Sequence, residues 1–287
     1  MYSAIFWNVV QGGVTLASAI AAAGLAYTTV IERTSIVTEN VSFHLPRLGE
    51  EFHGLRVAQI SDLHFRPYTG EREIAAAVDA VNAAHPDVIV LTGDYVTSTW
   101  LLDLGQRTAD GIEECAEILK RMRAPLGVYA VLGNHDWNTD ADRIAAALSA
   151  AGIRVLRNEA AALERGNSRL WIAGADDAYY RKADLDRTLA GIPTNDPVLL
   201  LAHEPDFADE AARHPIDLQF SGHAHGGQIF IPGIGAPYLP PMGRKYPRGR
   251  YQVRNMHLYS NRGIGVHGAP VRFYASPEVT IATLHAA

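Results

Sequence analysis

Five short clusters of polar residues are the parts of this 287-residue chain best suited to do chemistry. They are Ser61-Asp62-Leu63-His64, Gly93-Asp94, Gly133-Asn134-His135-Asp136, His203-Glu204-Pro205-Asp206 and Ser221-Gly222-His223-Ala224-His225. Carboxylate oxygens and imidazole nitrogens are ligands suited to manganese, iron, zinc or magnesium. A single carboxylate such as Asp94 can bridge two cations with its two oxygens. The clusters therefore indicate a metal site made from histidine and carboxylate side chains.

The spacing within two clusters favours a common direction of their ligands. Asp62 and His64 are two residues apart, as are His223 and His225, so in a locally extended chain both side chains of each pair point the same way. Each cluster alone is also common in surface loops and turns, and only the ordered set points to a metal centre. The one cysteine, Cys115, excludes an intramolecular disulfide and a cysteine-rich zinc site. We expect it to pack within a helix.

Every cluster directly follows an apolar run that is typical of a buried strand. We expect these strands at Leu55–Ile60, Asp87–Leu91, Gly127–Leu132, Val198–Ala202 and Asp217–Phe220. Helical patterns alternate with them at Glu71–His85, Asp110–Met122, Thr139–Ala151 and Asp206–His214. This alternation predicts an α/β fold, and the short strands and turns after Ser221 indicate a second sheet or an extension. Because ligand sites of such folds form outside the carboxyl ends of strands, we expect the clusters to converge.

The ordered set D-x-H, G-D, G-N-H-[DE], H and G-H-x-H resembles the motifs of the calcineurin-like metallophosphoesterase superfamily, and it extends from Asp62 to His225. The form Ser-Gly-His-Ala-His-Gly-Gly-Gln is more narrowly similar to the membrane-associated bacterial branch, which includes hydrolases of UDP-2,3-diacylglucosamine. The resemblance implies a four-layer α/β/β/α sandwich that holds two divalent cations. Manganese is the first expectation for both, before iron, zinc or magnesium.

The resemblance also assigns a role to each motif position. The first cation would be held by Asp62, His64 and His225, and the second by Asn134, His203 and His223. Asp94 would bridge the two cations. His135 would be the catalytic histidine near the leaving-group oxygen, while a metal-bridging hydroxide attacks phosphorus.

Three neighbouring residues have open roles. Asp136 could orient His135, or it could form a turn or helix cap. Arg66 could contact a substrate phosphate through its two-pronged guanidinium, or lie solvated in a loop. Glu204 could support the adjacent His203, or face water.

Histidines outside the motifs have a simpler expectation. His267 lies in the glycine-rich loop 263–268 and could approach the site. The other six are expected to have surface or structural roles; they are His44, His53, His85, His214, His257 and His285.

The first 31 residues carry no charged side chain, and about 20 apolar residues suffice to span a bilayer as a helix. We therefore expect 1–31 to be a membrane anchor, with a cleaved signal peptide or a buried helix as alternatives. Residues 32–54 are expected to form a tether with one edge strand, and 55–287 the metallophosphoesterase domain. The nearest basic residues, Arg33 and Arg47, follow the apolar segment, which favours a cytoplasmic domain.

The net charge and the distribution of charged residues indicate which kinds of binding partner suit this chain. With 25 basic and 31 acidic residues the net charge is -6, which argues against nucleic acid as a partner. No acidic residue lies between Asp217 and Glu278, although seven basic residues do. This stretch either attracts anionic head groups or forms a solvated loop.

These observations predict a membrane-tethered dimetal phosphoesterase that acts on a small-molecule or lipid-linked phosphate. The alternatives are a phosphodiesterase or nuclease for a soluble substrate, and a metal-binding regulatory module without catalysis.

Overall fold

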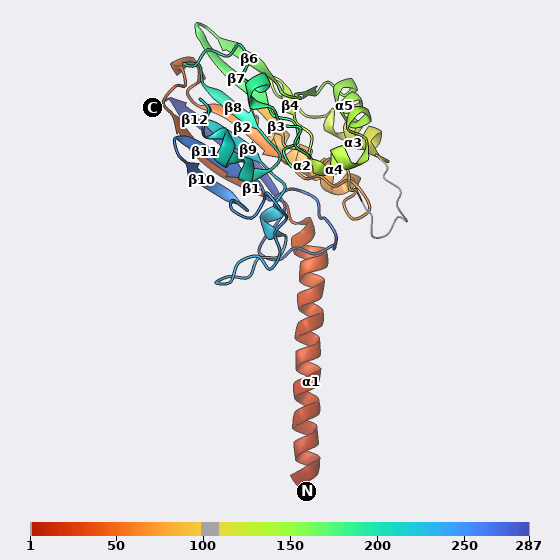
Figure 1. Ribbon diagram of the computed structural model, residues 1–287. Coiled ribbons are helices and arrows are strands. Elements are labelled where there is room, and N and C mark those ends of the chain that lie inside the picture. The colour runs from red at the N-terminus through yellow and green to blue at the C-terminus, as the bar shows by residue number, and fades with distance from the viewer. Residues whose placement is uncertain (1, 99–108, 287) are drawn as a thin grey trace.

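Two six-stranded sheets lie face to face, with helices on their outer faces (Figure 1). The computed structural model describes residues 2–98 and 109–286. Residue 1 of the expected anchor, and residues 99–108 and 287 of the expected domain, lie outside the described residues.

Both sheets are mixed, and their central strands are parallel. In spatial order, the first sheet contains β1 (Val37–Leu45), β12 (Glu278–Ala286), β2 (Leu55–Ile60), β3 (Val88–Leu91), β4 (Val128–Ala130) and β5 (Arg154–Val155). The second contains β10 (Gly249–Val253), β11 (Met256–Ser260), β9 (Leu218–Ser221), β8 (Val198–Leu201), β7 (Ser168–Gly174) and β6 (Glu159–Arg165). The five expected strands are present as β2, β3, β4, β8 and β9, so the five polar clusters follow the carboxyl ends of these strands.

Helices cover the outer face of each sheet. On the first sheet lie α2 (Glu71–Ala83), α3 (Ile112–Leu119) and α5 (Ala141–Ala150), and on the second lie α6 (Leu185–Thr188) and α7 (Ala208–Ala211). The apolar side of α2 follows helical spacing, since Ile74, Ala77, Val78 and Val81 are all buried. Cys115 packs in the same layer, as expected.

A separate apolar core fills the space between the sheets. Leu55, Val57 and Val88 of the first sheet meet Leu199 and Phe220 of the second. Strands β2 and β3 are buried along nearly their whole length, as expected for parallel strands covered on both faces. The expected four-layer α/β/β/α sandwich is therefore confirmed.

Some boundaries differ from the sequence-based expectation. The helix expected at Thr139–Ala151 is present as α5, which begins at Ala141. A separate short helix, α4 (Asn134–Thr139), precedes it, and Asp140 lies between the two. The Asp140 side chain accepts a hydrogen bond from the backbone N–H of Arg143 and so caps α5. The helix expected at Asp206–His214 shortens to one 3₁₀ turn followed by α7.

Residues 32–54, expected to be a tether with one edge strand, do supply the edge strand β1, but they are also packed into the sandwich. Strand β1 pairs in parallel with β12, which the sequence did not predict. Phe43, Leu45 and Phe52 are buried between the sheets. Arg47 forms an ion pair with Asp217 at 2.6 Å, which joins this segment to the second sheet.

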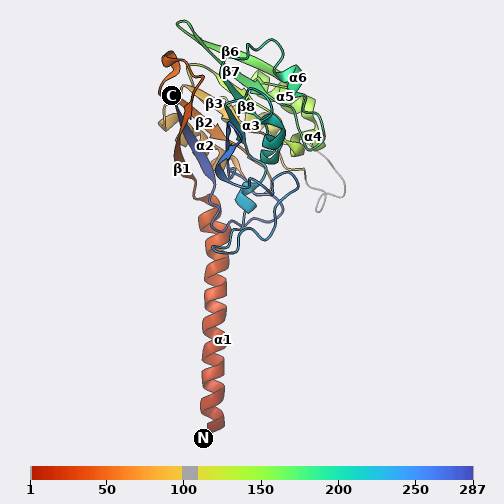
Figure 2. The same cartoon turned by 60° about the vertical axis from the view of Figure 1, so that its left-hand side comes forward.

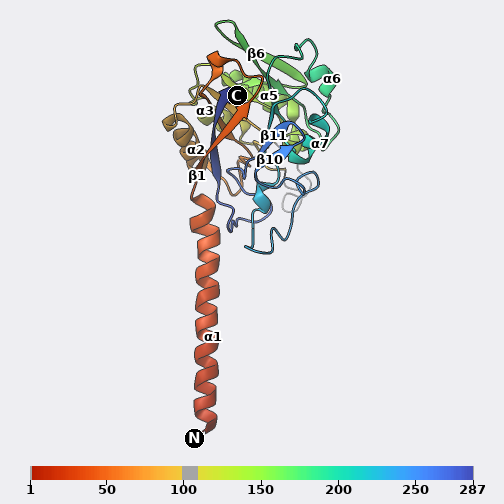
Figure 3. The ribbon, with the colours of Figure 1, turned by 90° about the vertical axis from the view of Figure 1, so that its left-hand side faces the viewer.

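The N-terminal helix α1 (Tyr2–Ala26) extends away from the sandwich (Figures 1 and 3). It continues through a π-helical turn, Tyr27–Ile31, and a 3₁₀ turn, Glu32–Thr34. The stretch Gln11–Thr34 is long and apolar enough to cross a membrane, with a mean hydropathy of 1.7.

If residues 32–54 belong to the folded unit, replacing Phe52 by alanine should destabilise the whole domain. Removing a buried phenylalanine costs about 3–5 kcal/mol. Urea unfolding of the full chain in detergent, followed by tryptophan fluorescence, measures this loss. The control Glu50→Ala changes an exposed side chain two residues away, and its effect should stay within about 0.5 kcal/mol. Equal, small effects of both variants would mean that the segment is a free tether.

Candidate metal centre

The polar clusters converge at the carboxyl ends of the central strands of both sheets. Asp62, His64 and His225 form one group of potential ligands. The Nε2 atoms of His64 and His225 lie 3.0 Å apart, and Nε2 of His225 lies 3.3 Å from an oxygen of Asp62. Ligands bound to one cation at about 2.1 Å are separated by about 3 Å when they are adjacent. The spacing of this group fits one divalent cation.

A second group contains Asp94, His203 and His223. Nδ1 of His223 lies 2.8 Å from the side-chain oxygen of Asn134, and Nε2 of His203 lies 3.1 Å from Oδ2 of Asp94. The same Oδ2 is 3.7 Å from Nε2 of His64, which belongs to the first group. Asp94 therefore lies between the two groups, where one carboxylate can contact two cations.

Hydrogen bonds fix the tautomers of two histidines. Nδ1 of His203 donates to the backbone carbonyl of Thr92 at 2.6 Å, and Nε2 of His223 donates to that of Pro241 at 2.8 Å. The remaining nitrogen of His223 then presents a lone pair to the oxygen of Asn134, so two acceptors face each other. A divalent cation between them would resolve this conflict, and carbonyl partners of this kind are common around metal-binding histidines.

Burial and charge act together on the ionisable groups. Burial lowers the pKa of His64 and of His225 well below its usual range, so both rings are neutral and can offer lone pairs. Burial raises the pKa of Asp62 to about 6. Burial would raise the pKa of Asp94 as well, but His203 outweighs this effect and holds it well below its usual value. Burial alone would lower the pKa of His203, but the carboxylate of Asp94 outweighs burial and raises it well above its usual value. A bound cation would replace the proton that His203 and Asp94 share.

The backbone at the site is strained. Five of the seven expected ligands have left-handed conformations; they are Asp62 (φ 50°), His64 (φ 43°), Asp94 (φ 58°), His223 (φ 66°) and His225 (φ 52°). Each costs about 1 kcal/mol relative to ordinary backbone, and such residues persist where the surrounding structure holds them. The backbone at Gly133 also lies very close to the Asp94 side chain. Glycine is required there, because a Cβ on residue 133 would lie 2.3 Å from Oδ1 of Asp94.

His135 lies in the first turn of α4 and is held by two neighbours. Its backbone N–H donates to Oδ1 of Asp94 at 2.8 Å. The backbone N–H of Ser98 donates to Nδ1 of His135 at 2.9 Å. The ring proton is therefore on Nε2. Burial lowers the pKa of His135 to about 4, so the ring is neutral and can donate a hydrogen bond through Nε2.

The three residues with open roles have different positions. Asp136 is buried and accepts the backbone N–H groups of Asp94, Tyr95 and Gly133, each at 2.9 Å, so it joins two loops rather than orienting the His135 ring. Arg66 forms an ion pair with Glu114 and lies outside the lining of the pocket described below.

Glu204 is buried and faces away from water. It accepts the backbone N–H of Ala178 at 3.1 Å. Burial and the adjacent Glu204 carboxylate raise the pKa of Asp177 to about 9, so a protonated Asp177 can hydrogen-bond to Glu204. The pair holds the turn that carries Tyr179 and Tyr180. No sequence pattern singles out Asp177, since its partner Glu204 is distant along the chain.

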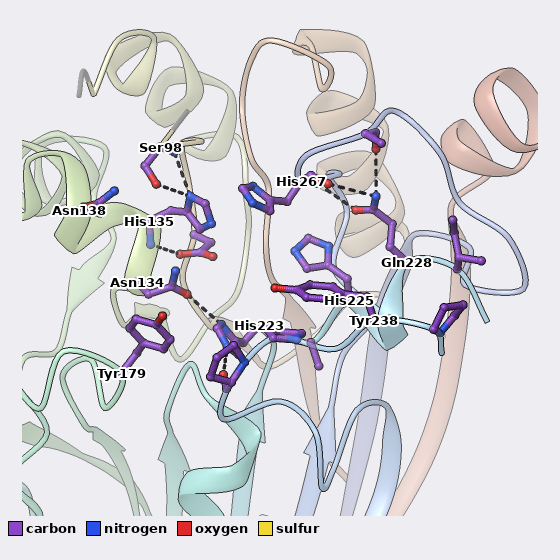
Figure 4. Close-up of a pocket in the computed structure, with 18 of the residues that line it drawn as sticks. Ser98, Asn134, His135, Asn138, Tyr179, His223, His225, Gln228, Tyr238 and His267 are labelled. Carbon is purple, nitrogen blue, oxygen red and sulfur yellow. Dashed lines mark hydrogen bonds between the residues drawn. The ribbon is translucent and has the colours of Figure 1, made fainter. Parts of the chain in front are cut away.

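A pocket of about 490 Å³ opens onto these groups (Figure 4). One part of its lining is polar and includes Asp94, Asn134, His135, His223 and His225. The other part is largely apolar and consists of Ile229, Pro237, Tyr238, Pro240, Pro241, Ala269 and Val271. The pocket can therefore hold a molecule with a charged group at one end and an apolar group at the other.

His267 is the one histidine outside the motifs that reaches this pocket in the part of the chain described. Its ring centroid lies 4.5 Å from that of His135, and it forms a third potential ligand group with His64 and His135. Its glycine-rich loop was the only sequence signal for this position.

Comparison with known proteins agrees with the motifs. The family model of calcineurin-like phosphoesterases matches residues 55–227, which confirms the resemblance inferred from the sequence. An uncharacterized metallophosphoesterase of Bacillus subtilis, YkuE, is 32% identical over 95% of this chain and 94% of its own length. A zebrafish transmembrane protein with a metallophosphoesterase domain is 32% identical over 84% of this chain, which spans 55% of that protein. The UDP-2,3-diacylglucosamine pyrophosphatase LpxG of Chlamydia trachomatis is 24% identical over 88% of this chain and 90% of its own length.

If the site binds divalent cations, metal should stabilise the fold. A ligand at 100 times its Kd adds about 2.7 kcal/mol, which raises the Tm of a domain of this size by about 5–10 °C. Differential scanning fluorimetry of chelator-treated protein, before and after addition of Mn²⁺, measures the shift. Asp94→Asn should remove most of it because this carboxylate contacts both groups. The exposed-carboxylate control Asp79→Asn should retain the whole shift, and an Asp94→Asn shift of the same size would contradict the assignment.

Proposed function

The chain belongs to the calcineurin-like phosphoesterase family, and we propose that it is a membrane-tethered dimetal phosphoesterase. Residues 1–31 provide the anchor. The bond hydrolysed is a phosphodiester or diphosphate in a lipid-linked substrate such as UDP-2,3-diacylglucosamine. The observation that carries this proposal is the pocket, in which a cluster of potential metal ligands adjoins an apolar wall.

The charged end of the pocket suits a phosphate. When bound, two divalent cations supply positive charge for the phosphate oxygens and lower the pKa of a water molecule between them. One cation would be held by Asp62, His64 and His225. The other would be held by Asn134, His203 and His223, and Asp94 would contact both cations. Manganese is the first candidate, and iron, zinc or magnesium are alternatives, because carboxylate oxygen and imidazole nitrogen suit all four.

His135 is proposed to assist departure of the leaving group. Its Nε2 carries the proton, because Nδ1 accepts the N–H of Ser98. From the pocket wall, Nε2–H can donate a hydrogen bond to the leaving-group oxygen, which gains negative charge when its bond to phosphorus breaks. His267 lies beside it and is positioned to contact the same part of the substrate.

The apolar wall supports a substrate with a lipid portion. Ile229, Pro237 and Val271 have no polar side-chain group that could take part in phosphate hydrolysis, yet they line the same cavity. The relative LpxG, which is named for a lipid-linked diphosphate, agrees with this reading.

Hydrolysis of UDP-2,3-diacylglucosamine and of a soluble chromogenic phosphodiester, both with Mn²⁺, tests the proposal. His135→Ala should lower kcat by about 10²–10⁴-fold while the protein still binds two metal ions. Asp94→Asn should lose both activity and metal, as measured by elemental analysis. The control His53→Ala, which changes an exposed histidine before the start of β2, should leave both unchanged.

Each part of the proposal can fail separately. Full hydrolysis by both site variants would remove the catalytic assignment. Hydrolysis of the soluble ester alone would remove the lipid-linked substrate, and metal binding without hydrolysis of either compound would leave a regulatory module.

A further inference from the structure

The loop 229–241 is uncharged and exposes large apolar side chains. It contains three isoleucines and four prolines but no acidic or basic residue. Ile234 is 81% exposed and Tyr238 is 70% exposed. The exposed fraction of Ile234 is larger than that of every large apolar side chain of α1 whose exposure is described. Exposure on this scale is costly in water, and it indicates a surface that contacts another apolar phase.

The conformation of the loop places Ile234 at its tip. Ile231 and Gly235 form an antiparallel bridge, with hydrogen bonds of 2.9 and 2.8 Å between their backbone groups. The N–H of Ile234 donates to the carbonyl of Ile231 at 3.0 Å. The tip is therefore an ordered turn that projects an isoleucine.

A short series of hydrogen bonds joins this loop to the apolar helix. The N–H of Phe230 donates to the carbonyl of Phe273 at 2.8 Å. One residue earlier, the N–H of Arg272 donates to the carbonyl of Thr28 at 3.0 Å. Thr28 lies within the candidate membrane span Gln11–Thr34. The loop is thus held at the level where this helix would leave a membrane.

Two buried charges strengthen this junction. The Arg272 side chain is wholly buried and donates to the carbonyls of Ala275 and Gly263. The carboxylate of Glu32, also buried, accepts the N–H of Ala275 at 2.9 Å. Because both side chains are buried and bonded, the helix end, the loop 263–277 and the pocket form one unit. All three ribbon views agree that these loops lie at the end of the domain where α1 joins it (Figures 1, 2 and 3).

We propose that the loop 229–241 enters the head-group layer of the bilayer beside α1, so that the pocket opens onto the lipid surface. The proposal rests on the proposed function, since it assumes the anchor and identifies where the substrate enters. Tyr238 within the loop and Tyr274, next to the loop's backbone partner Phe273, are both exposed, and tyrosine is favoured at membrane interfaces. A phosphate-bearing lipid could then place its head group at the ligand cluster while its chains stay near the bilayer.

The charge of the sequence around the loop 229–241 agrees with contact between this loop and a lipid surface. Residues 218–277 contain seven basic residues and no acidic one. Of the seven, Arg272 is buried, and Lys245 and Arg262 form ion pairs with acidic residues outside this stretch, which leaves four others. Arg244 follows the loop and is exposed. Basic residues near an anionic leaflet gain about 1 kcal/mol each, whereas an apolar surface for a second protein has no need of this charge.

Site-directed labelling of the full chain tests the location of the loop. In a Cys115→Ala background, Ile234→Cys receives a bimane fluorophore, and the protein is reconstituted in vesicles of phosphatidylcholine and phosphatidylglycerol. Lipids that carry a nitroxide should quench this label by at least about half of the quenching seen at Val14→Cys within α1. The control Ser149→Cys, an exposed position on α5, should show almost none.

Quenching at position 234 no greater than at position 149 would overturn the proposal. So would a label that is shielded from aqueous iodide but not quenched by lipid, because this result indicates a protein partner or a second copy of the chain. Neither result depends on activity, so failure here differs from failure of the proposed function.

A second measurement uses Ile234→Asp, which adds a charge at the tip outside the pocket lining. Hydrolysis of the lipid substrate in vesicles should fall by roughly tenfold because the charge opposes insertion. Hydrolysis of the soluble phosphodiester should not change. An equal fall with both substrates, or no fall with either, would contradict a role of this loop at the membrane.

Discussion

The carboxylate of Asp94 is buried, and much of the site is arranged around the cost of keeping that charge away from water. One of its oxygens accepts the backbone N–H of His135, and the other faces His203 and His64. The buried Asp136 accepts N–H groups from the loops after β3 and β4 and so fixes both around Asp94. Loss of one partner would leave a buried charge without compensation, so these loops can hardly move independently.

The two-sheet sandwich makes this arrangement possible. The potential ligands follow β2, β3 and β4 of one sheet and β8 and β9 of the other, because all five strands end at the same edge. Several of the potential ligands have left-handed backbone conformations, which a flexible loop would relax. Each of these left-handed residues lies within four residues of the end of a strand that is almost wholly buried, so the apolar core supports the strain at the polar edge.

The helix that could span a membrane is joined to the pocket and not only to the end of the domain. The loop 263–277 bonds to Thr28 and Glu32 on one side. On the other side it bonds to Gln228, whose side chain donates to the carbonyls of His267 and Ala269. The position of the helix and the shape of the pocket mouth therefore depend on the same backbone.

The sequence alone predicted the strands that carry the clusters, their order and the chemistry of the expected ligands, because strand formation and ligand type are local properties. It also indicated the uncharged N-terminal segment for the same reason. Only the tertiary structure decided which nitrogen of His203 and His223 faces the site, since the deciding carbonyls lie 111 and 18 residues away. It likewise placed His267 in the pocket and β12 between β1 and β2. Contacts between residues so far apart leave no pattern in either segment, and they form only when the sheets pack together.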